Sequence, residues 1–96
     1  MHADLTVSKP VVMANPAAIL GGTSHLCLSA DFGDSTVRVA TWDDGAQTWS
    51  SVHLYPVGRA ASPTVLPLPS NVGKVSLTLQ ENASEEAWPV GVDILA

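Results

Sequence analysis

The sequence predicts a small all-β protein, and three observations lead to that prediction. An Asp44-Gly45 pair lies between two strand-like runs, 35–41 and 48–54, and Asp and Gly suit the turn of a β-hairpin. Segments of alternating apolar and polar residues recur at roughly ten-residue spacing, with turn residues between them. Helix signals are almost absent. We therefore expect one antiparallel β-sandwich over residues 1–96, Ig-like or jelly roll, with about seven or eight short strands; a small barrel is the alternative.

The first expected elements are short. Residues 3–8 alternate weakly and residues 11–13 form an apolar run, so each is expected to be a short strand. One helical turn is expected at 15–20, because Pro16 suits the first helical position and Gly21 ends the helix. A helix of that length is not stable without tertiary contacts.

The middle of the chain shows the clearest alternation. Residues 24–30, 35–42 and 48–54 are expected to be strands, and alternate apolar side chains should face inward. Together with the C-terminal strands they are expected to form a core of Leu26, Leu28, Val37, Val39, Trp49, Val75, Leu77, Leu79, Val92 and Ile94. If Trp49 lies in this core, Trp49→Ala should cost about 3–5 kcal/mol.

The segment 55–70 is rich in proline. A structureless loop of this length is unusual in a small domain, so residues 64–68 are expected to form an edge strand. Pro67 fits an edge because it cannot donate a hydrogen bond to a central ladder. Residues 74–80 alternate most cleanly of all, and a last strand is expected around 90–94.

Composition and charge exclude several classes of partner. The chain is 46% hydrophobic and only 14% charged, which suits a compact core and leaves apolar surface for a partner. Four basic residues stand against nine acidic ones, for a formal net charge of −5, and the four are scattered along the chain. Nucleic acids and anionic membranes both attract clustered Lys and Arg. We expect neither as a partner.

Cysteine usage and the N-terminus indicate a reducing compartment. Cys27 is the single cysteine, so an intrachain disulfide is impossible. Residues 1–6 lack the basic start and apolar run of a signal peptide. No apolar run approaches the roughly 20 residues of a membrane span. The protein is expected to be made and folded in a cytoplasm.

No group of residues indicates catalysis or a cofactor. His25 and Cys27 share one strand face, but a zinc site needs three or four ligands. The Asp residues of turns 31–34 and 43–44 lie at opposite ends of one strand, roughly 25 Å apart, too far to share a calcium ion or a glycoside. We expect no enzyme, no metal and no cofactor. A metal-dependent enzyme using His25 and Cys27 is the weakest alternative.

Three tryptophans are many for a domain of this size. Trp42 flanks the hairpin turn and is expected to cover it, and Trp88 is expected to be exposed ahead of the last strand. Exposed Trp42, Trp88 or Tyr55 on a β-sandwich can stack on sugar rings. A carbohydrate-binding module is therefore an alternative function.

The hairpin resembles a known structural motif. The string Thr41-x-Asp43-x-Gly45-x-x-Thr48-Trp49 is similar to the Asp-box of sialidases and related propellers, Ser/Thr-x-Asp-x-Gly-x-Thr-Trp, with one residue inserted before the Thr-Trp. An Asp-box is a structural hairpin without a catalytic role. One altered copy in 96 residues implies neither a propeller nor an enzyme.

A larger part of the chain, about residues 24–80, resembles the small β-sandwich structural proteins of tailed-phage virions. The matching features are the strand 36–39, Asp44-Gly45, Trp49, the Leu68-Pro69 turn and the strand 74–79. The chain departs from the usual form in having Trp42-Asp43 where a Ser often precedes the Asp-Gly, and Ala46 where a second Gly is common. The resemblance implies a capsid decoration or cement protein, or a small tail or neck component, without an active site.

This resemblance also implies partners and a location. The protein would bind the major capsid protein and copies of itself on the outside of the virion, after being made in the host cytoplasm. The N-terminal arm 1–13 and the segment 55–70 either add strands to a neighbour's sheet or complete the fold's own edges. The residues expected to contact a partner are Trp88, Trp42, Tyr55, Val57, Val65, Leu66 and Leu68.

Overall fold

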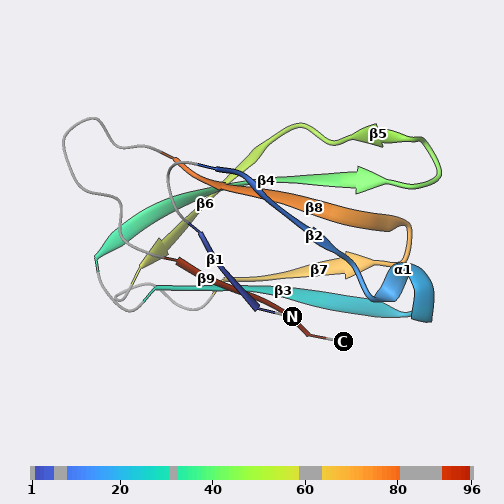
Figure 1. Ribbon diagram of the computed structural model, residues 1–96, viewed down its shortest axis with the longest axis horizontal. Helices are drawn as coiled ribbons and strands as arrows, with labels where there is room; N and C mark the ends of the chain where they lie inside the picture. The colour runs from blue at the N-terminus through green and yellow to red at the C-terminus, as the bar shows by residue number, and fades with distance from the viewer. Residues whose placement is uncertain (1, 6–8, 31–32, 59–63, 81–89, 96) are drawn as a thin grey trace.

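Two β-sheets pack face to face in the computed structural model, which describes residues 2–5, 9–30, 33–58, 64–80 and 90–95 (Figure 1). Within these ranges there are nine strands and one helix of a single turn. The prediction of an all-β sandwich of short antiparallel strands is confirmed.

One sheet has four strands and the other has five. The four-stranded sheet runs in the order β1 (His2–Leu5), β9 (Val90–Leu95), β3 (Thr23–Ser29) and β7 (Thr64–Pro69). The five-stranded sheet runs from β2 (Val11–Ala14) through β8 (Val72–Leu79) to β4 (Asp34–Asp43). Both β5 (Thr48–Trp49) and β6 (His53–Gly58) pair with β4 at its other side.

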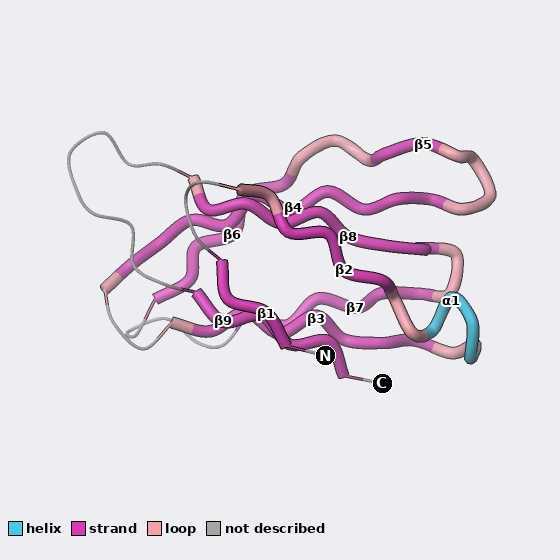
Figure 2. Tube along the Cα trace, viewed as in Figure 1, coloured by secondary structure: helices cyan, strands magenta, loops and turns pink. Residues whose placement is uncertain are grey.

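The N-terminal segment contributes one strand to each sheet. β1 pairs with β9 in the four-stranded sheet, and β2 pairs with β8 in the five-stranded sheet, as the trace in Figure 2 shows. Where the structure describes the predicted arm 1–13, its residues therefore complete the fold's own edges. They do not form a free contact strip.

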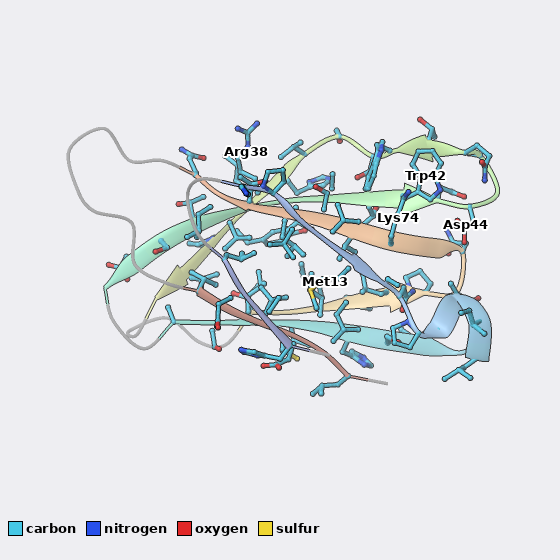
Figure 3. All side chains as sticks on the ribbon, viewed as in Figure 1. Met13, Arg38, Trp42, Asp44 and Lys74 are labelled. Carbon is cyan, nitrogen blue, oxygen red and sulfur yellow. The ribbon has the colours of Figure 1, made fainter. Side chains whose placement is uncertain are left out.

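The core lies between the two sheets and is built from alternate residues of their strands. Nine of the ten residues expected to face inward are buried, and Met13, Val57, Leu68 and Val90 join them. Figure 3 shows Met13 between the sheets and Arg38 pointing away from them. The two-residue period of each strand therefore predicts which face is inside.

Trp49 is the exception, because it is 40% exposed. The predicted strand 48–54 is interrupted: the chain leaves the ladder after β5 and rejoins it at β6. At the break, the Ser50 N–H donates to the Thr41 carbonyl oxygen (2.8 Å), and the Ser50 hydroxyl accepts from the Thr41 N–H (3.0 Å). Trp49 pairs with Trp42 at an outward position of β4, so its assignment to the core is wrong.

The hairpin turn is longer than the Asp-Gly pair predicts. Four residues join β4 to β5, and the positive φ falls on Gln47 (55°) and not on Gly45. The Asp43 carboxylate accepts hydrogen bonds from the N–H groups of Gly45 (2.9 Å) and Ala46 (3.1 Å). The Gln47 N–H donates to the Asp43 carbonyl oxygen (2.8 Å). The predicted hairpin is present, but the residue before the Asp-Gly pair organises its turn.

Prolines lie in or beside three of the edge strands. β7 is an edge strand, as Pro67 predicts, and it also contains Pro69; β6 contains Pro56, while Pro10 and Pro16 bracket β2. Proline has no N–H to donate, so addition of a neighbour's strand is disfavoured at these edges. The described residues of the Pro-rich segment form β6 and β7 of the protein's own sheets.

Candidate functional site

A single helical turn at one end of the sandwich exposes two large aliphatic side chains. α1 (Ala17–Leu20) joins β2 to β3 (Figure 1). Ala17 is buried, whereas Ile19 is 89% exposed and Leu20 is 77% exposed. No other large hydrophobic residue in the described ranges is as exposed. We call this pair the α1 tip and regard it as the strongest candidate contact site, because adjacent exposed aliphatic residues favour burial against a partner.

Asn15 holds the α1 tip in place. Its side chain is almost fully buried, and its amide nitrogen donates to the carbonyl oxygens of Leu68 (3.3 Å), Pro69 (3.1 Å) and Val72 (2.8 Å). Its side-chain oxygen accepts from the Ala17 N–H (3.1 Å) at the start of the helix. One residue therefore ties the helical turn to the ends of β7 and β8, which belong to different sheets.

The surface after the α1 tip is open. Gly21 (φ 80°) and Gly22 (φ 79°) turn the chain from α1 into β3, a backbone conformation that glycine adopts readily. No atom of another segment lies within 4 Å of where a side chain at either position would begin. A partner can therefore approach Ile19 and Leu20 closely.

A second cluster, Trp42, Trp49 and Lys74, lies on the outer face of the five-stranded sheet. The two indole rings meet edge to face, with centroids 5.3 Å apart and planes at 66°. Lys74 is the cross-strand partner of Trp42, and its Nζ lies 4.8 Å from the Trp42 centroid and 5.5 Å from that of Trp49. The ammonium group is thus attracted to both rings and holds this corner together.

The hairpin that carries the two tryptophans is anchored to the turn between β7 and β8. The Asp44 N–H donates to the Asn71 carbonyl oxygen (3.0 Å). The Asp44 carboxylate lies directly over Gly73, where an added Cβ would come 2.6 Å from the Asp44 Cγ. Gly73 is therefore needed for this close approach.

A third cluster lies on the outer face of the four-stranded sheet. His2 bridges two carboxylates: its Nδ1 is 2.8 Å from Asp93 on β9, and its Nε2 is 3.1 Å from Asp4 on β1. The hydrogen bond and charge of Asp93, with a smaller contribution from Asp4, raise the pKa of His2 above its ordinary value of 6.5. This bridge fastens the edge strand β1 to β9.

The predicted contact residues of the Pro-rich segment do not share one face, because alternate residues of a strand point to opposite sides of its sheet. Val57 and Leu68 are fully buried in the core, so the prediction that they contact a partner is wrong. Tyr55 and Leu66 are half-buried and pack against the core. Val65 is exposed on the outer face.

The remaining predicted contacts are tryptophans. Trp42 is half-buried in the cluster with Trp49 and Lys74. Trp88 lies outside the described residues. The contact between Trp42 and Lys74 is not predictable from the local sequence, because the register of β4 on β8 brings the two residues together.

The α1 tip and Asn15 were not predicted as functional residues. The signal was present, because a one-turn helix has too few positions to bury two neighbouring aliphatic side chains as well as Ala17. The role of Asn15 has no comparable local signal. Its three carbonyl partners lie more than 50 residues away in the sequence.

His25 is exposed and Cys27 is half-buried on β3. Within the described ranges, no three His, Cys, Asp or Glu side chains are placed to hold a metal ion together. None of the helical structure described is long and apolar enough to cross a membrane. Comparison of the chain with protein-family models, with curated proteins and with solved structures found no match.

Proposed function

We propose that this chain is a non-enzymatic structural protein of a tailed-phage virion, a decoration or cement protein that binds the outer capsid lattice. The observation that carries the proposal is the α1 tip, with Ile19 and Leu20 exposed on a helical turn that Asn15 fixes to both sheets. A fixed apolar tip suits insertion into an apolar depression on a shell protein. The resemblance of residues 24–80 to virion β-sandwich proteins supports the same function.

The expected affinity of one copy is low. Burying one Ile and one Leu contributes about 1.5–3 kcal/mol each, or about 3–6 kcal/mol together. Association itself costs about 4–15 kcal/mol in lost freedom of motion. A decoration protein therefore gains from binding as several linked copies, since the second contact is then made at a high effective concentration. This supports a homo-oligomer on the lattice.

Cosedimentation tests the proposal. Empty shells are assembled from the major capsid protein encoded nearest to this gene and mixed with the purified chain. The wild-type chain and the Val52→Ser control, which alters another exposed aliphatic residue, should sediment with the shells. The double variant Ile19→Ser/Leu20→Ser should stay in the supernatant while keeping the wild-type melting temperature. Equal binding of the double variant, or no binding of the wild type, contradicts the proposal.

Glycan binding is the second candidate, and the exposed Trp49 beside Trp42 favours it. An indole face can stack on a sugar ring while Lys74 donates a hydrogen bond to a hydroxyl. Titration with a panel of oligosaccharides should change the tryptophan fluorescence of the wild type, and Trp49→Ala should abolish that change. A flat titration across the panel eliminates this candidate.

A further inference from the structure

We infer that copies of this chain associate head to tail, with the outer face of the five-stranded sheet of one copy docked on the outer face of the four-stranded sheet of the next. The inference says how copies of the chain would contact one another in the homo-oligomer of the proposed function, and it rests on that proposed function. Its evidence is the charge and the apolar content of the two faces.

The outer face of the five-stranded sheet is basic at its centre, and we call it the basic face. Arg38 is exposed there opposite Thr78, and Lys74 lies four residue pairs further along the same two strands, opposite Trp42. Arg38 makes no ion pair with any residue that the structure describes. Of the chain's four basic residues, two therefore lie on this one face.

The basic face also carries exposed apolar side chains. Val12 (58% exposed), Leu54 (56%) and Trp49 (40%) surround its centre. Between Arg38 and Lys74 the sheet presents the small residues Ala40 and Ser76, which pair across β4 and β8. Asp34 begins β4 at the far end of the face, where its carboxylate lies over the backbone of Gly58.

The outer face of the four-stranded sheet has the opposite charge, and we call it the acidic face. Asp4 and Asp93 lie there on neighbouring strands, both bound to His2. Their side chains remain 75% and 43% exposed. The face has small residues of its own, because Gly91 pairs with Ser29. Val65 (52% exposed) and Leu95 (55%) add apolar area.

Only the docking of a basic face on an acidic face places Arg38 and Lys74 opposite the carboxylates of Asp4 and Asp93. Two basic faces docked on each other would oppose Arg38 and Lys74 of both copies, and two acidic faces would oppose Asp4 and Asp93. Like charges across an interface cost free energy, whereas a basic face on an acidic face pairs cations with carboxylates. Proline in β6 and β7 disfavours strand addition at those two edges, so edge-to-edge pairing there does not compete with face-to-face contact.

Such a contact is heterologous, so in a complex of two copies each copy retains one unused face. Head-to-tail contacts of this kind close into rings or continue as open stacks, in contrast to a two-fold dimer, which uses the same patch on both copies. This difference makes the arrangement testable with two complementary variants, each of which damages one face.

The variant of the basic face is Arg38→Glu, and its matched control is Lys9→Glu. Lys9 is exposed and is not one of the residues that define either face. Arg38→Glu and Lys9→Glu change the net charge of the chain equally. The variant of the acidic face is Asp4→Asn/Asp93→Asn, which removes both carboxylates without adding a cation that could attract Glu at position 38 of the other variant. Far-UV circular dichroism and thermal melts first establish that every variant is folded.

Analytical ultracentrifugation from micromolar to near-millimolar concentration then reports association of the purified chain. We expect the wild type and Lys9→Glu to associate with rising concentration, and less at high salt. Each face variant alone should be monomeric, because one of its faces is damaged. An equimolar mixture of the two should form a one-to-one complex and nothing larger, because each variant supplies the intact face that the other lacks.

Three results overturn the inference: a wild type that stays monomeric throughout, either face variant associating like the wild type, or a mixture that stays monomeric. None of them bears on shell binding, which depends on the α1 tip and is measured separately with Ile19→Ser/Leu20→Ser. Shell binding by a monomeric wild type would leave the proposed function intact and refute only the head-to-tail contact.

Discussion

Replacing Asn15 should destabilise the protein more than any change of a surface asparagine. Asn15→Ala removes a donor from the carbonyl oxygens of Leu68, Pro69 and Val72, and removes the acceptor of the Ala17 N–H. A buried polar group left without a partner costs about 1–3 kcal/mol. The carbonyl oxygens can accept other bonds and the three share one amide group, so we expect a loss of about 3–4 kcal/mol in the free energy of unfolding.

Urea unfolding followed by far-UV circular dichroism measures this loss. A domain of this size has about 5–15 kcal/mol of stability in total, so the midpoint should fall markedly while the slope m stays constant. The control is Asn71→Ala, at an exposed turn position whose backbone carbonyl, not its side chain, binds Asp44. That change should stay within about 0.5 kcal/mol of the wild type.

Asn15→Asp adds a test by pH. The new carboxyl keeps an acceptor for the Ala17 N–H but faces three carbonyl oxygens, so only its protonated form can donate to them. Burial and the carbonyl oxygens therefore raise its pKa in the folded state above that in the unfolded chain. Between these two pKa values the folded state binds more protons than the unfolded chain. The stability of this variant should therefore fall as pH rises from the unfolded pKa to the folded pKa. A loss below about 1 kcal/mol for Asn15→Ala, or no pH dependence for Asn15→Asp relative to wild type, refutes the reasoning.

Three further predictions concern Trp49, the His2 bridge and the Asp44–Gly73 contact. Trp49→Ala should lower the free energy of unfolding by about 1–2 kcal/mol, less than the loss of a core tryptophan, because Trp49 is 40% exposed. A loss above about 3 kcal/mol in urea unfolding would indicate that Trp49 belongs to the core. The pKa of His2 is raised, so its bridge to Asp93 and Asp4 adds stability at pH values below the ordinary 6.5, and this is lost as pH rises through the folded pKa; an NMR titration of the ring should show the raised pKa, and His2→Gln should flatten the stability profile in that window. Gly73→Ala should cost about 0.5–1 kcal/mol, because the new Cβ displaces only the exposed Asp44 carboxylate, and the cost should shrink in an Asp44→Ala background; a double-mutant cycle without coupling would contradict this.

The sequence predicts the fold well because burial alternates along most strands. Leu26 and Leu28 on β3, like Val37 and Val39 on β4, lie inside as a two-residue period requires. The same logic fails at Trp49, because Ser50 interrupts the strand with hydrogen bonds to Thr41 that the period does not encode. Local alternation can be read from the chain, whereas an interruption by a side chain cannot.

The candidate contact residues were harder to predict. Val57 and Leu68 are predicted as partner contacts because they belong to an apolar stretch of the segment 55–70, but both side chains lie in the core, on β6 and β7. Ile19 and Leu20 lie in a turn whose orientation depends on Asn15 and on carbonyl groups of β7 and β8. Which apolar side chains remain outside is decided by these long-range hydrogen bonds.

The proline-bearing edges have a consequence for how the protein behaves when crowded. β6 contains Pro56, and β7 contains Pro67 and Pro69. Because proline has no N–H to donate, a continuous cross-β ladder between molecules is interrupted at these positions. Concentrated samples should therefore stay free of amyloid-like fibrils, and copies brought together should separate again on dilution with each sandwich unchanged.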